Sequence, residues 1–143
     1  NNALKRTIES PRLYFLDTGL VSYLLKWTTK ETLQNGAMSG QILETYAVSE
    51  IVKSFKNKGI HEMPIYFYRD KDMKEIDLVI VDQEKLYPIE IKKTMNPLKT
   101  MTKNFSVLKR ALGYEIHREI ILCLVDQNTL LSDRILAYPI KLI

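Results

Sequence analysis

The stretch EIDLVIVDQEKLYPIEIK, which occupies residues 75–92, predicts a β-hairpin and decides the fold. Its two ends are rich in isoleucine, valine and leucine, as strands are, and the polar residues between them are few enough for a tight reversal. A turn centred between Gln83 and Glu84 makes Asp77 and Glu90 cross-strand partners.

The hairpin is predicted to gather three charged side chains on one patch of sheet. Directly opposed residues share a face and lie about 4.5–5.5 Å apart at Cβ, so the carboxylates of Asp77 and Glu90 come close together. Alternation along the second strand puts Lys92 on that same face, whereas Ile91 points to the other side. Like charges directly opposite each other destabilise a sheet, so we expect this patch either to bind a cation or to be retained because it has a function.

The composition is that of one ordinary globular domain. The chain has 143 residues, enough to bury a core, and we expect a single domain over residues 1–143. A net charge of +4 permits contact with nucleic acid without requiring it. The one cysteine, Cys123, lies in an apolar run, so a reducing, cytoplasmic compartment is expected. No apolar stretch is long enough to predict a span across a bilayer, and the first residues do not show the pattern expected of a signal peptide.

The beginning of the chain indicates a piece of a longer protein. It opens Asn1-Asn2-Ala3 without a methionine, and the polar residues 1–10 are expected to lead in from an upstream part. The apolar residues 13–16 predict a short strand. Asp17 is then expected to cap a helix over residues 20–25.

Residues 41–55 predict an amphipathic helix. On a helical wheel its apolar half is formed by Leu43, Ala47, Val48, Ile51, Val52 and Phe55. Glu44 lies within that apolar arc, where a charged side chain needs a partner.

The remaining elements complete an α/β pattern. Residues 65–69 predict a strand rich in aromatics, and residues 119–125 predict a strand covered on both faces. Asn96 and Pro97 predict the start of a helix that Gly113 ends. The buried stripe of that helix is predicted to be Leu98, Met101, Phe105, Leu108 and Leu112.

One more strand is predicted over residues 135–140, at an edge of the sheet because it contains Pro139. From residue 41 the order is thus helix, three strands, helix, strand. This order predicts an α/β fold with a central mixed sheet flanked by helices and a core over about residues 41–125.

The charged patch suits hydrolysis of a phosphodiester. That reaction needs charge neutralised on the phosphorus oxygens and hydroxide near neutral pH, and Mg²⁺ supplies both while preferring one or two carboxylates and several waters. Asp77 and Glu90 would supply the carboxylates, and the backbone carbonyl of Ile91 a third oxygen. Lys92 would orient the attacking water or stabilise the developing charge. Glu44 would bind a second ion or hold a water.

These residues resemble the pattern of the PD-(D/E)xK nuclease superfamily, whose fold is that of restriction endonucleases. The chain is more narrowly similar to the C-terminal domain of many bacterial and archaeal AAA+-type ATPases. The motifs that carry the likeness are Leu13-Tyr14-Phe15-Leu16-Asp17-Thr18-Gly19-Leu20, Glu44 with Val48-Ser49-Glu50, Tyr66-Phe67-Tyr68-Arg69-Asp70, Glu75-Ile76-Asp77 and Pro88-Ile89-Glu90-Ile91-Lys92. The resemblance implies a restriction-endonuclease-like fold and an upstream ATPase module in the full-length chain.

Two departures from that pattern matter. Ile76 stands where the superfamily has its name-giving proline, and Lys93 follows Lys92, so the strand register decides which ammonium points inward.

Plainer readings stand beside these predictions. Glu44 falls in the first turn of its predicted helix, where a negative charge favours the helix dipole. Asp77 and Glu90 would also fit an exposed sheet face on which they pair with Lys92 and Arg69.

The basic residues Lys93, Lys99, Lys103 and Arg110 are predicted to contact nucleic acid if the domain is a nuclease, and otherwise form a solvated face. Two functions follow. One is a Mg²⁺- or Mn²⁺-dependent endonuclease-type phosphodiesterase acting on DNA, with no organic cofactor. The alternative is an inactive nuclease-like module that binds DNA or protein and regulates an attached ATPase.

Overall fold

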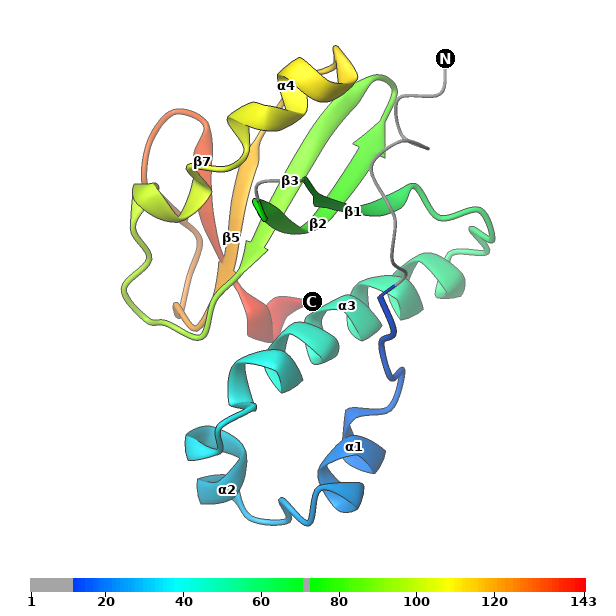
Figure 1. Ribbon diagram of the computed structural model, residues 1–143, viewed down its shortest axis with the longest axis vertical. Coiled ribbons are helices and arrows are strands. Elements are labelled where there is room, and N and C mark those ends of the chain that lie inside the picture. Colours follow the sequence, from blue (N-terminus) through cyan, green and yellow to red (C-terminus); the bar gives the residue numbers. More distant parts are fainter. Residues whose placement is uncertain (1–11, 71–72) are drawn as a thin grey trace. The chain divides into compact units, whose positions relative to one another are not determined.

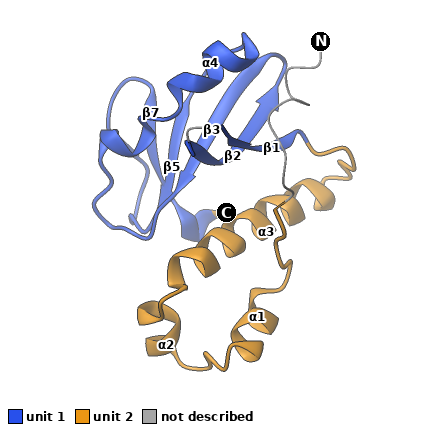
Figure 2. Ribbon diagram, in the orientation of Figure 1, with its two compact units in different colours: residues 1–11, 64–142 blue, residues 12–63, 143 orange. Residues whose placement is uncertain are grey.

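The computed structural model describes residues 12–70 and 73–143, so the predicted lead-in over residues 1–10 lies outside the described part. The described chain forms two compact units, shown in Figure 2. Unit 1 comprises residues 64–142, and unit 2 comprises residues 12–63 together with Ile143. The prediction of one domain over the whole chain stays a prediction.

Unit 1 is built on a mixed β-sheet (Figure 1). Within its described residues the strands are β1 (Ile65–Arg69), β2 (Glu75–Asp82), β3 (Lys85–Ile91), β4 (Glu115–Ile116), β5 (Glu119–Cys123), β6 (Thr129–Leu130) and β7 (Ile135–Pro139). Their order across the sheet is β1-β2-β3-β5-β7-β6, and β4 also pairs with β3. The first three strands are antiparallel, whereas β3, β5 and β7 run parallel.

The predicted order of elements is confirmed. Helix α3 (Ser39–Asn57) precedes β1, β2 and β3, and helix α4 (Ser106–Leu112) precedes β5. The chain therefore has the mixed α/β architecture expected from its alternating patterns, with α3 two residues longer at each end than predicted.

The hairpin of β2 and β3 has the predicted register. Leu78 pairs with Ile89, and Asp82 pairs with Lys85. The two turn residues, Gln83 and Glu84, have φ values of 45° and 66°. Two successive residues with positive φ form the type I′ turn whose twist matches that of the flanking strands.

Strand β3 contains Pro88, although β3 is an interior strand of the sheet, where proline is normally excluded. The Leu86 carbonyl accepts from the His117 amide at 2.9 Å, and the Lys92 amide donates to the Leu122 carbonyl at 3.0 Å, so even-numbered residues of β3 face β4 and β5. The missing N–H of Pro88 therefore faces the break between β4 and β5. The proline is tolerated because strand pairing is interrupted there.

The main core of unit 1 lies between the sheet and α4. Its buried members are Tyr68, Ile76, Val79, Leu86, Phe105, Val107 and Leu108. A smaller cluster joins Ile121, Cys123 and Ala137. Gly113, with φ of 74°, ends α4 as predicted.

The predicted start of that helix at Asn96 and Pro97 is wrong. A 3₁₀ helix, η2 (Lys99–Thr102), comes first, and α4 begins only at Ser106. The hydroxyls of Thr102 and Ser106 donate to the carbonyls three residues before them, at 3.1 and 3.5 Å, and such bonds compete with α-helical pairing. Leu98 is extended and 60% exposed, so it does not belong to the buried stripe.

The predicted edge strand is also corrected. Strand β7 pairs with β5 on one side and with β6 on the other, so it is not at the edge. Strand β6 pairs only with Leu136 and Ala137, however, and Pro139 lies past its end. Pro139 is tolerated because β6 no longer pairs with β7 at this position.

Unit 2 consists of α1 (Thr18–Leu24), α2 (Lys30–Asn35) and α3. Asp17 caps α1 as predicted, because its Oδ1 accepts the Leu20 amide at 3.0 Å. The strand predicted over residues 13–16 is wrong, since these residues have no strand partner among the described residues.

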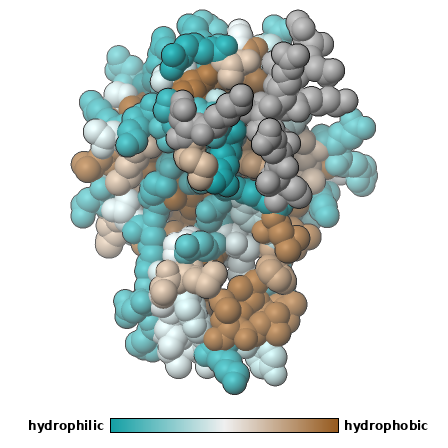
Figure 3. All heavy atoms as spheres, viewed as in Figure 1, coloured by the Kyte–Doolittle hydropathy of each residue, from teal (hydrophilic) through white to brown (hydrophobic). Residues whose placement is uncertain are grey.

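Helix α1 leaves its apolar side chains uncovered within the described chain. Figure 3 shows an apolar patch over this helix, and the exposed large residues of the segment are Leu13, Phe15, Leu16, Leu20, Tyr23, Leu24 and Leu25. None of the helices in residues 12–70 and 73–143 has the length and apolar character needed to cross a bilayer.

Replacing Glu84 with glycine is expected to stabilise the protein by about 1 kcal/mol, because a side chain strains a residue at positive φ. Urea unfolding measures the effect. The matched control is Lys85→Gly, one residue further along at an ordinary strand conformation, which should cost about 0.5–1 kcal/mol. Destabilisation by both substitutions would contradict the type I′ turn.

Candidate functional site

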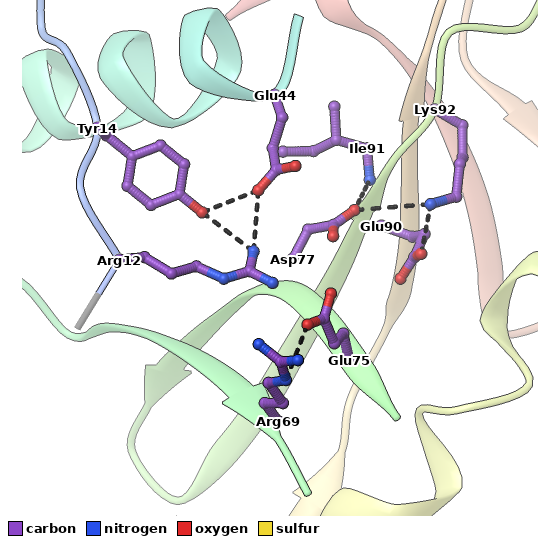
Figure 4. A network of polar contacts seen from close by, with 9 residues as sticks. All are labelled: Arg12, Tyr14, Glu44, Arg69, Glu75, Asp77, Glu90, Ile91 and Lys92. Atoms are coloured by element: carbon purple, nitrogen blue, oxygen red, sulfur yellow. Dashed lines mark hydrogen bonds and ion pairs between the residues drawn. The ribbon is translucent and has the colours of Figure 1, made fainter. Parts of the chain in front are cut away.

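Three charged groups meet at the open end of the β2–β3 hairpin, away from its turn (Figure 4). The Lys92 Nζ lies 2.6 Å from Glu90 Oε1 and 3.8 Å from Asp77 Oδ2. The Ile91 amide donates to Asp77 Oδ2 at 2.8 Å. The predicted convergence of Asp77, Glu90 and Lys92 is thus present within unit 1.

A β-bulge aims Asp77 at this position. Tyr66 pairs with Val79 but Tyr68 pairs with Ile76, so two residues of β2 oppose one residue of β1. The extra residue lets Ile76 and Val79 enter the same core cluster although strict alternation would separate them. The Asp77 carboxylate then takes the place of a backbone acceptor for β3. This bulge was not predicted from the sequence.

Burial distinguishes this cluster from an exposed sheet face. Asp77 and Glu90 are each only 8% exposed, which contradicts the plainer reading that they lie on the surface. Arg69 pairs with Glu75, with 3.1 Å between Nε and Oε1. Two buried carboxylates beside each other require nearby positive charge, and the Lys92 ammonium provides it.

The register settles which lysine points inward. The side chain of Lys92 is 40% exposed and reaches both carboxylates, whereas Lys93 is exposed. The inward ammonium also remains accessible to a ligand from solvent.

The donor set fits a hard divalent cation. A residue in a strand directs its N–H and C=O to the same side, so the Ile91 carbonyl faces β2 with the amide that binds Asp77. Two carboxylates and one carbonyl are all-oxygen ligands, as Mg²⁺ prefers, and leave room for waters. Within residues 12–70 and 73–143, no group of three or more His, Cys, Asp and Glu side chains could hold a metal.

Glu44 lies in unit 2, and its predicted place in the same site stays a prediction. Its Oε1 accepts from Arg12 Nη1 and from the Tyr14 hydroxyl, each at 2.9 Å (Figure 4). The predicted need for a partner on the apolar arc is met by these two residues. Because α3 begins at Ser39, Glu44 is in the second turn, and the proposed first-turn dipole effect loses its basis.

The contacts of Arg12 and Tyr14 with Glu44 were not predicted from the sequence. The signal was present, because Tyr14 stands in an apolar run in which a hydroxyl needs a partner when buried. Burial raises the pKa of Tyr14 to about 12, opposed by the hydrogen bond from Arg12 and assisted by the Glu44 charge.

The other residues predicted to contact nucleic acid follow the site along the chain. Lys93, Lys99, Lys103 and Arg110 are all exposed on the segment that follows β3. Their role in binding nucleic acid stays a prediction.

Comparison with known proteins gives a family match and two distant relatives. A family model described as "Domain of unknown function (DUF4143)" matches residues 39–143. Uncharacterized protein Rv2008c of Mycobacterium tuberculosis and uncharacterized protein Mb2031c of Mycobacterium bovis are each 25% identical over 138 residues. The alignment covers 96% of this chain but only 29% of each relative.

Replacing Lys92 with methionine is expected to lower the free energy of unfolding by about 2 kcal/mol, because two buried carboxylates lose their cation. In a double-mutant cycle by urea unfolding, Lys92→Met with Glu90→Gln should cost clearly less than the two single changes added together. Lys93→Met is the control and should stay within about 0.5 kcal/mol of wild type. Additive losses would show that the ammonium does not stabilise the carboxylates.

Tyr14 is expected to make the unfolding free energy depend on pH in the alkaline range. Its folded pKa of about 12 exceeds its ordinary value of 10, so its stabilising contribution is complete below pH 10 and is lost as pH rises to about 12. Urea unfolding across this range should show a shallower decline for Tyr14→Phe than for wild type. Tyr23→Phe, which removes a hydroxyl from a residue that is 72% exposed, should keep the wild-type decline.

Proposed function

The chain belongs to the DUF4143 family of domains of unknown function, and from its own residues we propose that it is a Mg²⁺-dependent phosphodiesterase acting on nucleic acid. The observation that supports this most is the buried pair of Asp77 and Glu90 held within reach of one lysine. The resemblance to the PD-(D/E)xK superfamily, which uses these residue types in this order, points the same way.

Asp77, Glu90 and the Ile91 carbonyl would hold the ion. When bound, Mg²⁺ would set positive charge against the phosphate oxygens and make hydroxide available near neutral pH. Mn²⁺ would serve equally, since both ions take oxygen ligands. The hydrogen bond from the Ile91 amide keeps the Asp77 carboxylate in one orientation, which lowers the cost of organising the ligands.

Lys92 would act on the phosphate or on the attacking water. Its Nζ already lies beside both carboxylates, and its side chain is 40% exposed, so it can donate to a group that approaches from solvent. A cation fixed at that point stabilises negative charge that grows on the phosphorus oxygens in the transition state. The contact of 2.6 Å between Lys92 Nζ and Glu90 Oε1 fixes the position of the positive charge.

Glu44 enters the proposal through the resemblance alone, as the holder of a second ion or of a water. Arg12 and Tyr14 fix its carboxylate within unit 2. The proposal for Asp77, Glu90 and Lys92 does not depend on it.

The proposal extends to the longer protein. The chain spans 29% of the length of the curated relatives it matches, which leaves room there for further domains. By the resemblance, an upstream AAA+-type ATPase module would act with this domain on DNA. The alternative is a module that binds DNA or protein without cutting and regulates that ATPase.

Calorimetric titration of Mg²⁺ and Mn²⁺ tests the ion site. Asp77→Asn and Glu90→Gln should each weaken binding by more than about tenfold, because each removes a charged ligand. Glu75→Gln is the matched control on the same strand, since Glu75 pairs with Arg69, and it should bind as wild type. Binding that ignores the Glu90 change would overturn the proposed site.

Cleavage of single-stranded, duplex and branched DNA tests the reaction. Lys92→Met should retain ion binding but lose at least about 100-fold in cleavage rate, as when a transition-state donor is removed. Ion binding without cleavage of any of these substrates by wild type would favour the regulatory module instead.

A further inference from the structure

The segment that leaves the candidate site is strongly basic. Residues 92–114 contain five lysines and one arginine and no acidic residue. This basic segment starts at Lys92, runs through η2 and ends with α4, as the yellow-green and yellow part of Figure 1 shows. Its side chains Lys93, Lys99 and Lys103 are exposed, as phosphate contacts require.

Two large apolar side chains stand exposed in the middle of these lysines. Met95 is 64% exposed and Leu98 is 60% exposed. The turn that carries them is fixed at Thr94, whose amide donates to the Lys92 carbonyl at 2.9 Å and whose carbonyl accepts from Leu124 at 2.9 Å. The Thr94 Oγ1 also accepts the Asn96 amide at 3.1 Å. The backbone that presents Met95 is thus held to both β3 and the end of β5.

We propose that Met95 and Leu98 enter between base pairs of duplex DNA, while Lys93, Lys99 and Lys103 hold the phosphates on either side. Apolar side chains inserted at a base step unstack it and kink the duplex, and flanking basic residues hold the bent backbone. This inference rests on the proposed function, because it places the unstacked base step within a few base steps of the phosphate that Lys92 would reach. It assigns the substrate as duplex DNA that unstacks readily.

The neighbourhood of the two side chains favours DNA over a membrane surface. Binding in a membrane interface needs an amphipathic helix with a broad apolar face, whereas here two side chains project from a turn. Met95 lies three residues from Lys92, so it cannot be more than about 11 Å along the chain from the lysine at the carboxylates. At a rise of about 3.4 Å per base pair, the unstacked step would then lie within about three base steps of the reacting phosphate.

Fluorescence of an aminopurine base in a DNA duplex measures the unstacking. With Ca²⁺ in place of Mg²⁺, wild type should raise the emission on binding and should bind a duplex with a nick or mismatch at the probe about tenfold more tightly than an intact duplex. Met95→Ala with Leu98→Ala should abolish the rise and the preference. Lys99→Ala with Lys103→Ala should weaken binding to every duplex and flatten its salt dependence.

The matched control is Leu130→Ala, because Leu130 is 65% exposed on β6, at the far end of the strand order from β2. This variant should retain both the rise and the preference. Duplex binding without a rise in emission, no binding to DNA, or binding to anionic lipid vesicles in its place would overturn the inference. The Mg²⁺ titration separates the two proposals: if ion binding fails while the emission still rises, the phosphodiesterase proposal falls and the base-step contact stands.

Discussion

A lysine ammonium beside two buried carboxylates is the interaction on which the rest of this site depends. At about 4 Å and an effective dielectric of about 20, two like charges repel by on the order of 4 kcal/mol, which few single contacts outweigh. Lys92 offsets that repulsion between Asp77 and Glu90, and it does so while part of its side chain remains in contact with solvent. The carboxylates themselves are buried, so the half-exposed Lys92 side chain is the part of this cluster that meets solvent.

The hairpin could be predicted from the sequence because two local rules agree there. Strand alternation assigns every side chain to a face, and a two-residue turn at Gln83 and Glu84 fixes the register. The register brings Asp77 near Glu90 and Lys92, although the orientation of Asp77 also depends on the bulge in β2. The α/β order followed for the same reason, since each element is marked by its own periodicity.

The parts that could not be predicted depend on contacts between elements distant in sequence. The bulge at Asp77 exists because Ile76 and Val79 both pack into the core, and neither residue reveals that alone. The late start of α4 follows a 3₁₀ turn over Lys99–Thr102 in which the Thr102 hydroxyl bonds back to the Lys99 carbonyl, and the cap suggested by Asn96 does not reveal this turn. The partners of Glu44 lie thirty and more residues away, so a charge on an apolar arc indicates only that a partner exists.

Because Asp77, Glu90 and Lys92 lie on one hairpin or directly after it, they can come together early when the protein folds. A hairpin closes in about 1–10 μs, and the contacts between β2 and β3 span few residues. The parallel pairing of β3 with β5 joins Ile89 to Ile120 and must close a much longer loop, which slows it. The nascent chain would therefore bring Asp77, Glu90 and Lys92 together before the parallel part of the sheet is complete.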